Sequence, residues 1–387
     1  MNDLTEQLRE RVLAAATARA PLRIRGGGSK DFYGNPPSGE PLETGGHRGI
    51  VAYEPTELVV TARCGTPLAE LEAALEEKGQ MLAFEPPHFS PLPAEERGRG
   101  RGEAGGPALS PNLSPASGRG ELGATVGGAI AAGLSGPRRA TAGAARDFVL
   151  GVRLIDGRGE VLRFGGQVMK NVAGYDVSRL MAGALGTLGL LLEVSLKVLP
   201  KPAAEATLRF ELPQDKALEA LNRWSGQPLP LSASCWCDNL LSVRLSGARA
   251  AVAAARERLG GEALADADGF WRGLREQQAD FFRGEAPLWR LSLPSKTPPL
   301  GLPEAPLIEW GGAQRWLRGE LPDAQLREAA AQAGGHATLF RAGEDEKRRA
   351  GGAFQPLAAP LMEIQRRLKQ GFDPQGLFNP GRLHPEL

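Results

Sequence analysis

The sequence predicts an α+β protein with two domains. Its 387 residues exceed the roughly 100–200 of a single domain. Segments with helical spacing of apolar residues are interspersed with short β-rich runs. All six tryptophans lie beyond residue 200, where Pro200-Lys201-Pro202 interrupts the chain. This change in composition places a domain boundary near residue 200.

Local patterns predict the elements of the N-terminal domain, 1–200. Apolar residues at helical spacing indicate a helix over 4–19, and the alternation in 22–25 indicates a strand. Two β-rich runs fall within 50–62. A proline at the start and a glycine after the end delimit a helix over 67–78.

The segment 91–120 has a different composition from its surroundings. It holds 7 glycines and 5 prolines among 30 residues, with no aromatic or β-branched side chain. Such a segment buries too little apolar surface to offset the entropy of ordering it. We therefore predict a disordered insertion in the first domain.

Order is predicted again beyond residue 121. A strand over 149–155, the turn signal Asp156-Gly157 and a return strand over 160–164 read as a hairpin. A further strand spans 190–198. Alternating strands and helices make up the second domain, 201–345, and a helix over 356–370 begins the C-terminal segment, 346–387.

Composition and charge exclude several classes of protein. The net charge of +1 gives no overall attraction to nucleic acid or anionic membrane. Three cysteines cannot form a disulfide framework, which favours a reducing compartment. The N-terminus lacks the apolar core of a signal peptide, and the most apolar stretch, 180–199, is too interrupted to span a bilayer. We expect a soluble protein.

The first candidate binding motif is Arg25-Gly26-Gly27-Gly28-Ser29-Lys30, directly after a predicted strand. Consecutive glycines allow the positive φ angles, expected at Gly27, with which backbone N–H groups converge on an anion. An ordinary glycine-rich turn is the alternative. The motif is neither a Walker A loop nor a Rossmann fingerprint, because Asp31 stands where the third glycine would fall.

Two further small-residue motifs accompany the first. Gly123-Ala-Thr-Val-Gly-Gly128 opens an alanine-rich, helix-like run. Lys170-Asn-Val-Ala-Gly-Tyr-Asp176 is followed by 183–189, GALGTLG, which enters a predicted strand. Each motif offers bare backbone to a ligand, and close packing of helices is the alternative for the second.

Together with FDPQGLFNPGR at 372–382, these motifs resemble the FAD-linked oxidases of the vanillyl-alcohol-oxidase type, which carry a PCMH-type FAD-binding domain. With GGHATLF at 334–340, the pattern is most similar to the FAD-binding E subunits of bacterial glycolate oxidase. The resemblance implies a bipartite PCMH-type FAD-binding domain, formed by 1–200 and the C-terminal segment. A smaller α+β cap domain, 201–345, lies between its two parts.

The resemblance also implies which residues contact FAD. The first motif forms the pyrophosphate loop, the second lines the phosphates and the ribityl chain, and the third approaches the flavin and the adenosine. The implied cofactor-binding residues are Arg25, Gly26, Gly27, Gly28, Ser29, Lys30, Thr125, Gly127, Gly128, Gly186, Thr187, Leu188, Gly189 and Asn379.

Departures from the family pattern indicate how FAD is attached and which catalytic groups are lacking. No histidine stands beside the pyrophosphate loop and Cys64 is at no attachment position, so we infer noncovalent FAD. The four histidines are dispersed, and the Gly-Asp-Gly-Asn-x-His stretch of related D subunits is absent. We therefore predict no metal and leave the catalytic residues unassigned. His336 and the pair Cys235 and Cys237 are interpreted as structural.

The resemblance implies the FAD-binding subunit of a glycolate oxidase (glycolate dehydrogenase) complex. It oxidises a 2-hydroxy acid such as glycolate to a 2-oxo acid, or relays electrons within the complex. A self-sufficient FAD-linked oxidoreductase and a non-catalytic assembly subunit are the alternatives. The implied partners are a flavoprotein D subunit and an iron–sulfur F subunit, since three cysteines cannot hold a four-cysteine cluster. The expected location is cytoplasmic, or the inner face of the membrane through those partners.

Overall fold

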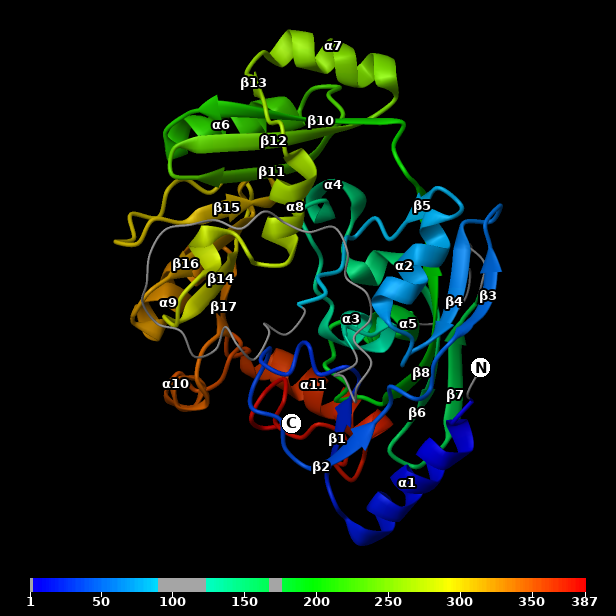
Figure 1. Ribbon diagram of the computed structural model, residues 1–387. Coiled ribbons are helices and arrows are strands. Elements are labelled where there is room, and N and C mark those ends of the chain that lie inside the picture. Colours follow the sequence, from blue (N-terminus) through cyan, green and yellow to red (C-terminus); the bar gives the residue numbers. More distant parts are fainter. Residues whose placement is uncertain (1–2, 90–122, 167–175) are drawn as a thin grey trace, which may run out of the picture.

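The computed structural model describes residues 3–89, 123–166 and 176–387. It contains helices and sheets in two main layers, each built around its own β-sheet (Figure 1). The predicted insertion at 91–120 and all but the last residue of the motif at 170–176 lie outside the described residues. Most predicted elements of the first 200 residues and the C-terminal helix are confirmed to within three residues at either end.

The first sheet has five antiparallel strands and corresponds to the predicted hairpin and β-rich runs. Its central strand, β8, is buried along almost its whole length. In spatial order the strands are β3 (Ile50–Glu54), β4 (Val59–Arg63), β8 (Leu190–Lys197), β6 (Val149–Ile155) and β7 (Val161–Gly165).

Two helices, α2 (Leu68–Glu76) and α3 (Val126–Ala132), pack against this sheet and bury Leu71, Leu75 and Ile130 completely or nearly so. The apolar spacing of the sequence in α2 thus faces the core as predicted. A short pair of strands, β5 (Gln80–Met81) and β9 (Leu199–Pro200), closes one end of this layer.

A second core lies between the sheet and the N-terminal helix α1 (Thr5–Ala18), where Leu8 and Val12 pack on Leu190 and Leu192. The parallel strands β1 (Leu22–Arg25) and β2 (Glu40–Glu43) join this core. The chain's last segment follows α11 (Ala359–Phe372) back to β1, where Phe378 pairs with Leu22.

The second sheet has eight antiparallel strands within residues 204–341. Their spatial order is β13 (Glu262–Ala263), β10 (Ala204–Glu211), β12 (Leu240–Gly247), β11 (Leu231–Cys237), β15 (Leu307–Glu309), β16 (Gln314–Arg318), β14 (Leu288–Ser292) and β17 (His336–Arg341). Strands and helices alternate along this part of the chain, as the sequence predicts.

Helices α6 (Gln214–Ser225), α7 (Arg249–Leu259) and α9 (Asp323–Gln332) cover one face of the eight-stranded sheet. The opposite face carries α8 (Ala267–Arg275) and looks toward the first layer. The shorter elements are α4 (Arg139–Ala142), α5 (Val177–Leu180), α10 (Glu344–Arg349) and the 3₁₀ turns at Ala145–Phe148, Asp280–Phe282 and Trp310–Gly312.

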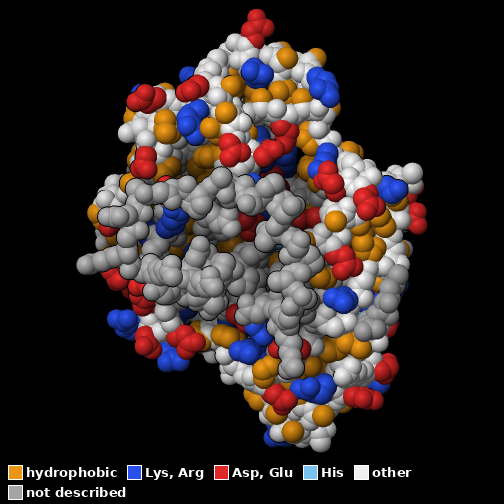
Figure 2. Space-filling view, viewed as in Figure 1, with side chains coloured by type: hydrophobic (Ala, Val, Ile, Leu, Met, Phe, Trp, Pro, Cys, Tyr) orange, Lys and Arg blue, Asp and Glu red, His pale blue; other side chains and the backbone are white. Residues whose placement is uncertain are grey.

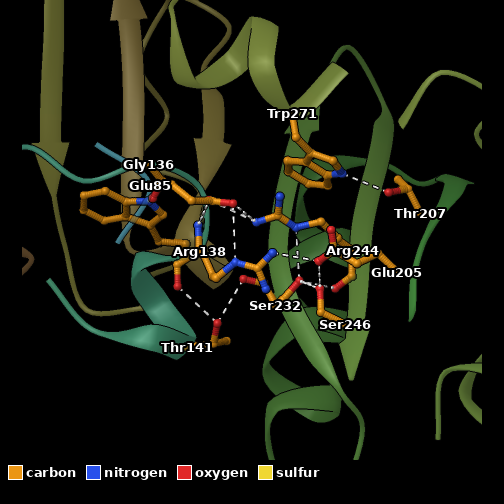
Figure 3. A network of polar contacts seen from close by, with 11 residues as sticks. Glu85, Gly136, Arg138, Thr141, Glu205, Thr207, Ser232, Arg244, Ser246 and Trp271 are labelled. Atoms are coloured by element: carbon orange, nitrogen blue, oxygen red, sulfur yellow. Dashed lines mark hydrogen bonds and ion pairs between the residues drawn. The ribbon is translucent and has the colours of Figure 1, made fainter. Parts of the chain in front are cut away.

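The two layers share an apolar core and a buried polar network. Tyr33 and Leu134 of the first layer pack with Trp271 and Trp316 of the second. Beside them, the Glu85 carboxylate accepts hydrogen bonds from the backbone N–H of Arg138 at 2.8 Å and from Nη2 of Arg244 at 2.8 and 3.0 Å (Figure 3). Ion pairs therefore join the layers in a place that excludes most solvent.

Arg138 connects the same network to the edge of the second sheet. Its Nη2 donates to Glu205 on β10 at 2.7 Å, and the ring of Trp271 lies 5.0 Å from the guanidinium of Arg244 (Figure 3). Ser232 accepts a hydrogen bond from Nε of Arg244 at 3.1 Å. Both arginines are thus held on several sides, which fixes how the sheet sits on the first layer.

The face of the molecule in Figure 2 shows no strong segregation of charge among its described side chains. On the face in Figure 2, basic and acidic side chains are interspersed over both layers. This agrees with the net charge of +1. Among the described residues, no helix is both long and apolar enough to cross a membrane.

Candidate functional site

An elongated cleft runs between the end of β1, the start of α3 and the C-terminal tail. It consists of two adjoining cavities, and the glycine-rich loop after β1 lines one of them while the entry to β8 lines the other. The lining residues common to both are Ile24, Gly26, Gly128, Ala131, Leu185 and Asn379. Because the cavities share these residues, they adjoin and form one continuous cleft.

The cleft brings together most residues that the sequence analysis selected. The first cavity is lined by Arg25, Gly26, Gly27, Gly28, Ser29, Lys30, Thr125, Gly128 and Asn379. The second adds Gly127, Gly186 and Gly189. These residues come from four separate segments of the chain, 25–30, 125–128, 186–189 and the tail at Asn379, yet they meet at one surface.

Thr187 and Leu188 do not line the cleft, although the sequence analysis selected them. Thr187 is 3% exposed, and its hydroxyl donates to the carbonyl of Ala184 at 2.8 Å. Leu188 packs into the core beneath the first sheet. The turn geometry of this motif thus exposes its glycines and turns the two larger side chains inward.

The loop after β1 offers backbone donors to the cleft. Among the described residues, none accepts a hydrogen bond from the N–H groups of Gly27, Gly28, Ser29 and Lys30. The positive φ expected at Gly27 instead falls on Gly28, at +73°. A side chain at Gly28 would be strained there, and its Cβ would lie 2.6 Å from Nη2 of Arg25.

Two glycines allow neighbouring segments to approach closely at the cleft wall. A Cβ on Gly26 would lie 2.4 Å from Oγ1 of Thr125, whose hydroxyl accepts the N–H of Gly128 at 3.2 Å. A Cβ on Gly127 would lie 2.5 Å from Cβ of Cys64. The small residues therefore set the width of the cleft as well as lining it.

Asn379 joins the tail to both walls of the cleft. Its Oδ1 accepts the N–H of Ile24 at 2.8 Å, and its Nδ2 donates to the carbonyl of Leu185 at 2.6 Å. Gly186, with φ at +71°, lies against the same amide, since a Cβ there would be 2.8 Å from Nδ2. The C-terminal segment is thus part of the site's framework.

A buried lysine holds this tail in place. Nζ of Lys369 on α11 donates to the carbonyls of Thr187 at 2.7 Å and Phe378 at 2.8 Å, and forms an ion pair with Asp373 at 2.8 Å. The side chain of Lys369 is 9% exposed because the tail folds over it.

Several lining residues were not among those that the sequence analysis selected, although Leu185 and Arg382 lie within two of its motifs. They are Ile24, Asp31, Thr44, Cys64, Ala131, Ala132, Leu185, Leu190, Leu191 and Arg382. Most are apolar or small, which is typical of any buried strand or helix. Arg382 follows the recognised Asn-Pro-Gly, and the motif signals it only indirectly. Its guanidinium donates to the carbonyl of Asp31 at 2.8 Å and supports the loop.

The basic side chains at the cleft have acidic side chains near them, which offset part of their charge. Arg25 pairs with Asp31 at 3.1 Å and with Glu43 at 3.5 Å. Burial lowers the pKa of Lys30 to about 8, opposed by the charge of Glu276. The ammonium of Lys30 lies 5.7 Å from the ring centroid of Phe89. Lys30 therefore titrates within the range in which proteins are commonly assayed.

The described residues include no cluster of histidine, cysteine, aspartate or glutamate suited to a metal ion. His88 bonds to Glu72 at 2.8 Å, and His47 and His384 are buried far apart in the chain. His336 begins β17 with an exposed side chain. Cys235 and Cys237 lie on β11 as free thiols.

Comparison with known proteins identifies the family of the chain. A family model described as "FAD binding domain" matches residues 3–92 and 112–165. The glycolate oxidase subunit GlcE of Escherichia coli is 49% identical over 385 residues, covering 100% of this chain and 99% of that protein. The glycolate oxidase subunit GlcD of Bacillus subtilis is 42% identical over 84 residues, 22% of this chain and 18% of its own length.

Solved structures show the same fold at low sequence identity. A 4-ethylphenol oxidase from Gulosibacter chungangensis superposes with a TM-score of 0.66 at 14% identity, covering 98% of this chain and 87% of that chain. A p-cresol methylhydroxylase gives 0.65 at 13% identity with the same coverage. These likenesses confirm the predicted α+β fold of the PCMH type.

Proposed function

Because the chain belongs to the family of FAD-binding glycolate oxidase subunits represented by GlcE, we propose that it is the FAD-binding subunit of a glycolate-oxidising complex. The observation that carries this proposal is the full-length match together with a cleft built from the matched glycine motifs. FAD is the cofactor and oxidation of a CH–OH group the reaction class.

The cleft fits FAD in shape and in chemistry. FAD is long and carries its negative charge at the pyrophosphate in its middle. The cleft is elongated, and the N–H groups of Gly27, Gly28 and Ser29, which have no partner among the described residues, stand beside its first cavity. Such a cluster of backbone donors binds phosphate oxygens. A Cβ on Gly26 would clash with Thr125 and a Cβ on Gly127 with Cys64, so these glycines let the walls of the cleft pack closely.

We assign distinct tasks to the three walls. The loop over 25–30 binds the pyrophosphate, Thr125 with Gly127 and Gly128 borders the phosphates and ribityl chain, and Gly186 with Gly189 borders the flavin and adenosine. Asn379 holds the walls together. Bound FAD supplies a two-electron acceptor, and the protein supplies binding, orientation and electrostatics.

We expect FAD to be bound noncovalently. Cys64, which lines the second cavity, has a pKa that burial raises far above its usual range, so its sulfur is a poor nucleophile. None of the described residues that line the two cavities is a histidine. Acid precipitation should leave at least about nine-tenths of the flavin in the supernatant. Flavin fluorescence retained on the denatured protein band would contradict this assignment.

The affinity for FAD should fall with rising pH because of Lys30. Its ammonium is charged below a pKa of about 8, and an anion bound in the cleft favours that charged form. Raising the pH from 7 to 9 removes the charge from the free protein and should weaken FAD binding about tenfold. Fluorescence titration of the apoprotein measures this dependence. The affinity of K30Q for FAD should not change over the same pH range. If the affinity of K30Q falls with pH as steeply as that of the wild type, a group other than Lys30 causes the dependence.

Electrons must leave the chain through another protein. The three cysteines are too few for a four-cysteine cluster, and burial raises the pKa of Cys235 and, to about 12, of Cys237. We therefore propose a flavoprotein D subunit and an iron–sulfur F subunit as partners. Glycolate is the proposed substrate, and the complex is cytoplasmic or associated with the inner face of the membrane through its partners.

Turnover with and without those partners tests the proposal. Glycolate-dependent reduction of an artificial acceptor should be low for the isolated chain and at least about tenfold higher per flavin in the mixture with both partners. A malate substrate under the same conditions is the control for specificity. Equal turnover without partners would support the self-sufficient oxidoreductase instead.

The other alternative is an assembly subunit without flavin chemistry. It predicts a colourless isolated chain, whereas the cleft predicts flavin absorbance in the visible range. The N–H groups of Gly27 to Lys30, which no described residue accepts, favour the flavoprotein, because an assembly role does not need them.

A further inference from the structure

A separate cavity, distinct from the two that form the cleft, lies between the eight-stranded sheet and residues 134–137 of the first layer. It is small, about 30 Å³. Five side chains of the sheet line it, and they come from four different strands: Arg290 on β14, Glu309 on β15, Gln314 and Trp316 on β16, and Phe340 on β17. The sequence analysis named none of these as functional.

Strand register places the polar members on one face of the sheet. Arg290 lies opposite Trp316, and Glu309 lies opposite Gln314. Since side chains alternate along a strand, Gln314 and Trp316 point to the same side, and so do their partners. The arrangement therefore collects one basic and one acidic side chain at one end of the apolar core between the layers.

Arg290 has an unused donor in this cavity. Its Nη2 donates to the hydroxyl of Tyr33 at 3.1 Å, and its guanidinium lies over the rings of Tyr33 and Phe340. Among the described residues, neither Nη1 nor the buried Nε of Arg290 has a hydrogen-bond partner, and the side chain forms no ion pair. A buried donor without a partner costs free energy, so a bound acceptor here stabilises the protein.

Glu309 has an unused acceptor in the same cavity. Its side chain is 4% exposed, and Oε2 accepts both the indole N–H of Trp316 at 2.7 Å and Nε2 of Gln314 at 3.0 Å. No described residue donates to Oε1. Burial raises the pKa of Glu309 to about 7, against the two hydrogen bonds, so the carboxyl exists in both forms near neutral pH.

We propose that this cavity binds a small carboxylate that carries a hydroxyl or oxo group on the adjacent carbon, with Arg290 holding the carboxylate and Oε1 of Glu309 contacting that second group. The proposal rests on the function proposed above, because both glycolate and its 2-oxo product belong to this class. The small volume and the ring of Phe340 limit the ligand to a few heavy atoms. A guanidinium suits a carboxylate because it donates two parallel hydrogen bonds.

Calorimetric titration of the FAD-loaded chain under anaerobic conditions tests this assignment. Glycolate should bind more tightly than acetate, which lacks the hydroxyl, and at least about tenfold more tightly than glycolamide, which lacks the charge. R290Q should weaken glycolate binding at least about tenfold and leave the FAD content unchanged. R290K, which keeps the charge but not the fork of donors, should lie between R290Q and the wild type.

A matched control removes an arginine from the same sheet outside the cavity. Arg318 on β16 lines none of this cavity, so R318Q should bind glycolate within about twofold of the wild type. Equal affinity for glycolate and glycolamide in the wild type would overturn the proposal. So would equal glycolate affinity in R290Q and R318Q.

The outcome separates this inference from the proposed function. Binding that depends on Arg290 without glycolate turnover in the mixture of subunits would contradict the function and leave the site in place. Turnover that survives R290Q, with unchanged glycolate affinity, would contradict the site and leave the function in place.

Discussion

Replacing Gly27 with aspartate is expected to abolish FAD binding. Gly27 lines the first cavity, in the loop whose N–H groups have no partner among the described residues. A carboxylate about 5 Å from the pyrophosphate costs roughly 3 kcal/mol at an effective dielectric constant of about 20, which weakens binding more than 100-fold. The purified G27D chain should therefore be colourless, while circular dichroism shows an unchanged fold.

The matched control for this variant is G27A. Positive φ falls on Gly28 rather than on Gly27, so alanine at position 27 meets no left-handed backbone requirement. G27A should purify with at least about half of the wild-type flavin, since it adds no charge. A G27D chain that purifies with full flavin occupancy would show that the pyrophosphate lies elsewhere.

Replacing Glu85 with alanine is expected to destabilise the protein by about 3–5 kcal/mol. Glu85 is the shared acceptor of Arg138 and Arg244, whose side chains are only 8% and 7% exposed (Figure 3). Its loss leaves Arg244 buried without a carboxylate, and an unpaired buried charge costs far more than an exposed one. The midpoint of urea unfolding, followed by tryptophan fluorescence, measures the change.

An exposed ion pair provides the comparison. Glu363 pairs with Arg367 on α11 at 2.8 Å, and their side chains are 49% and 78% exposed to solvent. E363A should therefore cost less than about 1 kcal/mol. A loss below about 1 kcal/mol for E85A as well would show that the network in Figure 3 does not hold the two layers together.

Local sequence patterns were sufficient to predict most helices and strands of the first 200 residues and most of the residues that line the cleft. The helices α1 and α2 and the strands β1, β6 and β8 follow from apolar spacing and from proline and glycine at their ends. The cleft follows from glycines because a bare backbone is itself the binding surface, so the signal is local. The domain boundary near residue 200 and the disordered insertion at 91–120 stay predictions.

Contacts between distant strands could not be predicted in this way. Glu309 meets Arg290 at one cavity only because β16 lies between β15 and β14 in the sheet, an order that no local pattern specifies. Glu85 reaches Arg244 across 159 positions because the segment after β5 packs against the second sheet. Thr187 and Leu188 do not line the cleft, because the Thr187 hydroxyl bonds to the carbonyl of Ala184 and Leu188 packs into the core of the first sheet; their contact with FAD stays a prediction.

The most direct test of the central claim asks whether this chain's own flavin is needed by the complex. Glycolate-dependent reduction of an artificial acceptor is measured with both partner subunits and with either G27D or G27A in place of the wild-type chain. The account predicts that the G27D complex assembles but loses at least about nine-tenths of the activity, while the G27A complex retains most of it. Full activity in a G27D complex whose chain carries no flavin would contradict the account and identify the chain as an assembly subunit.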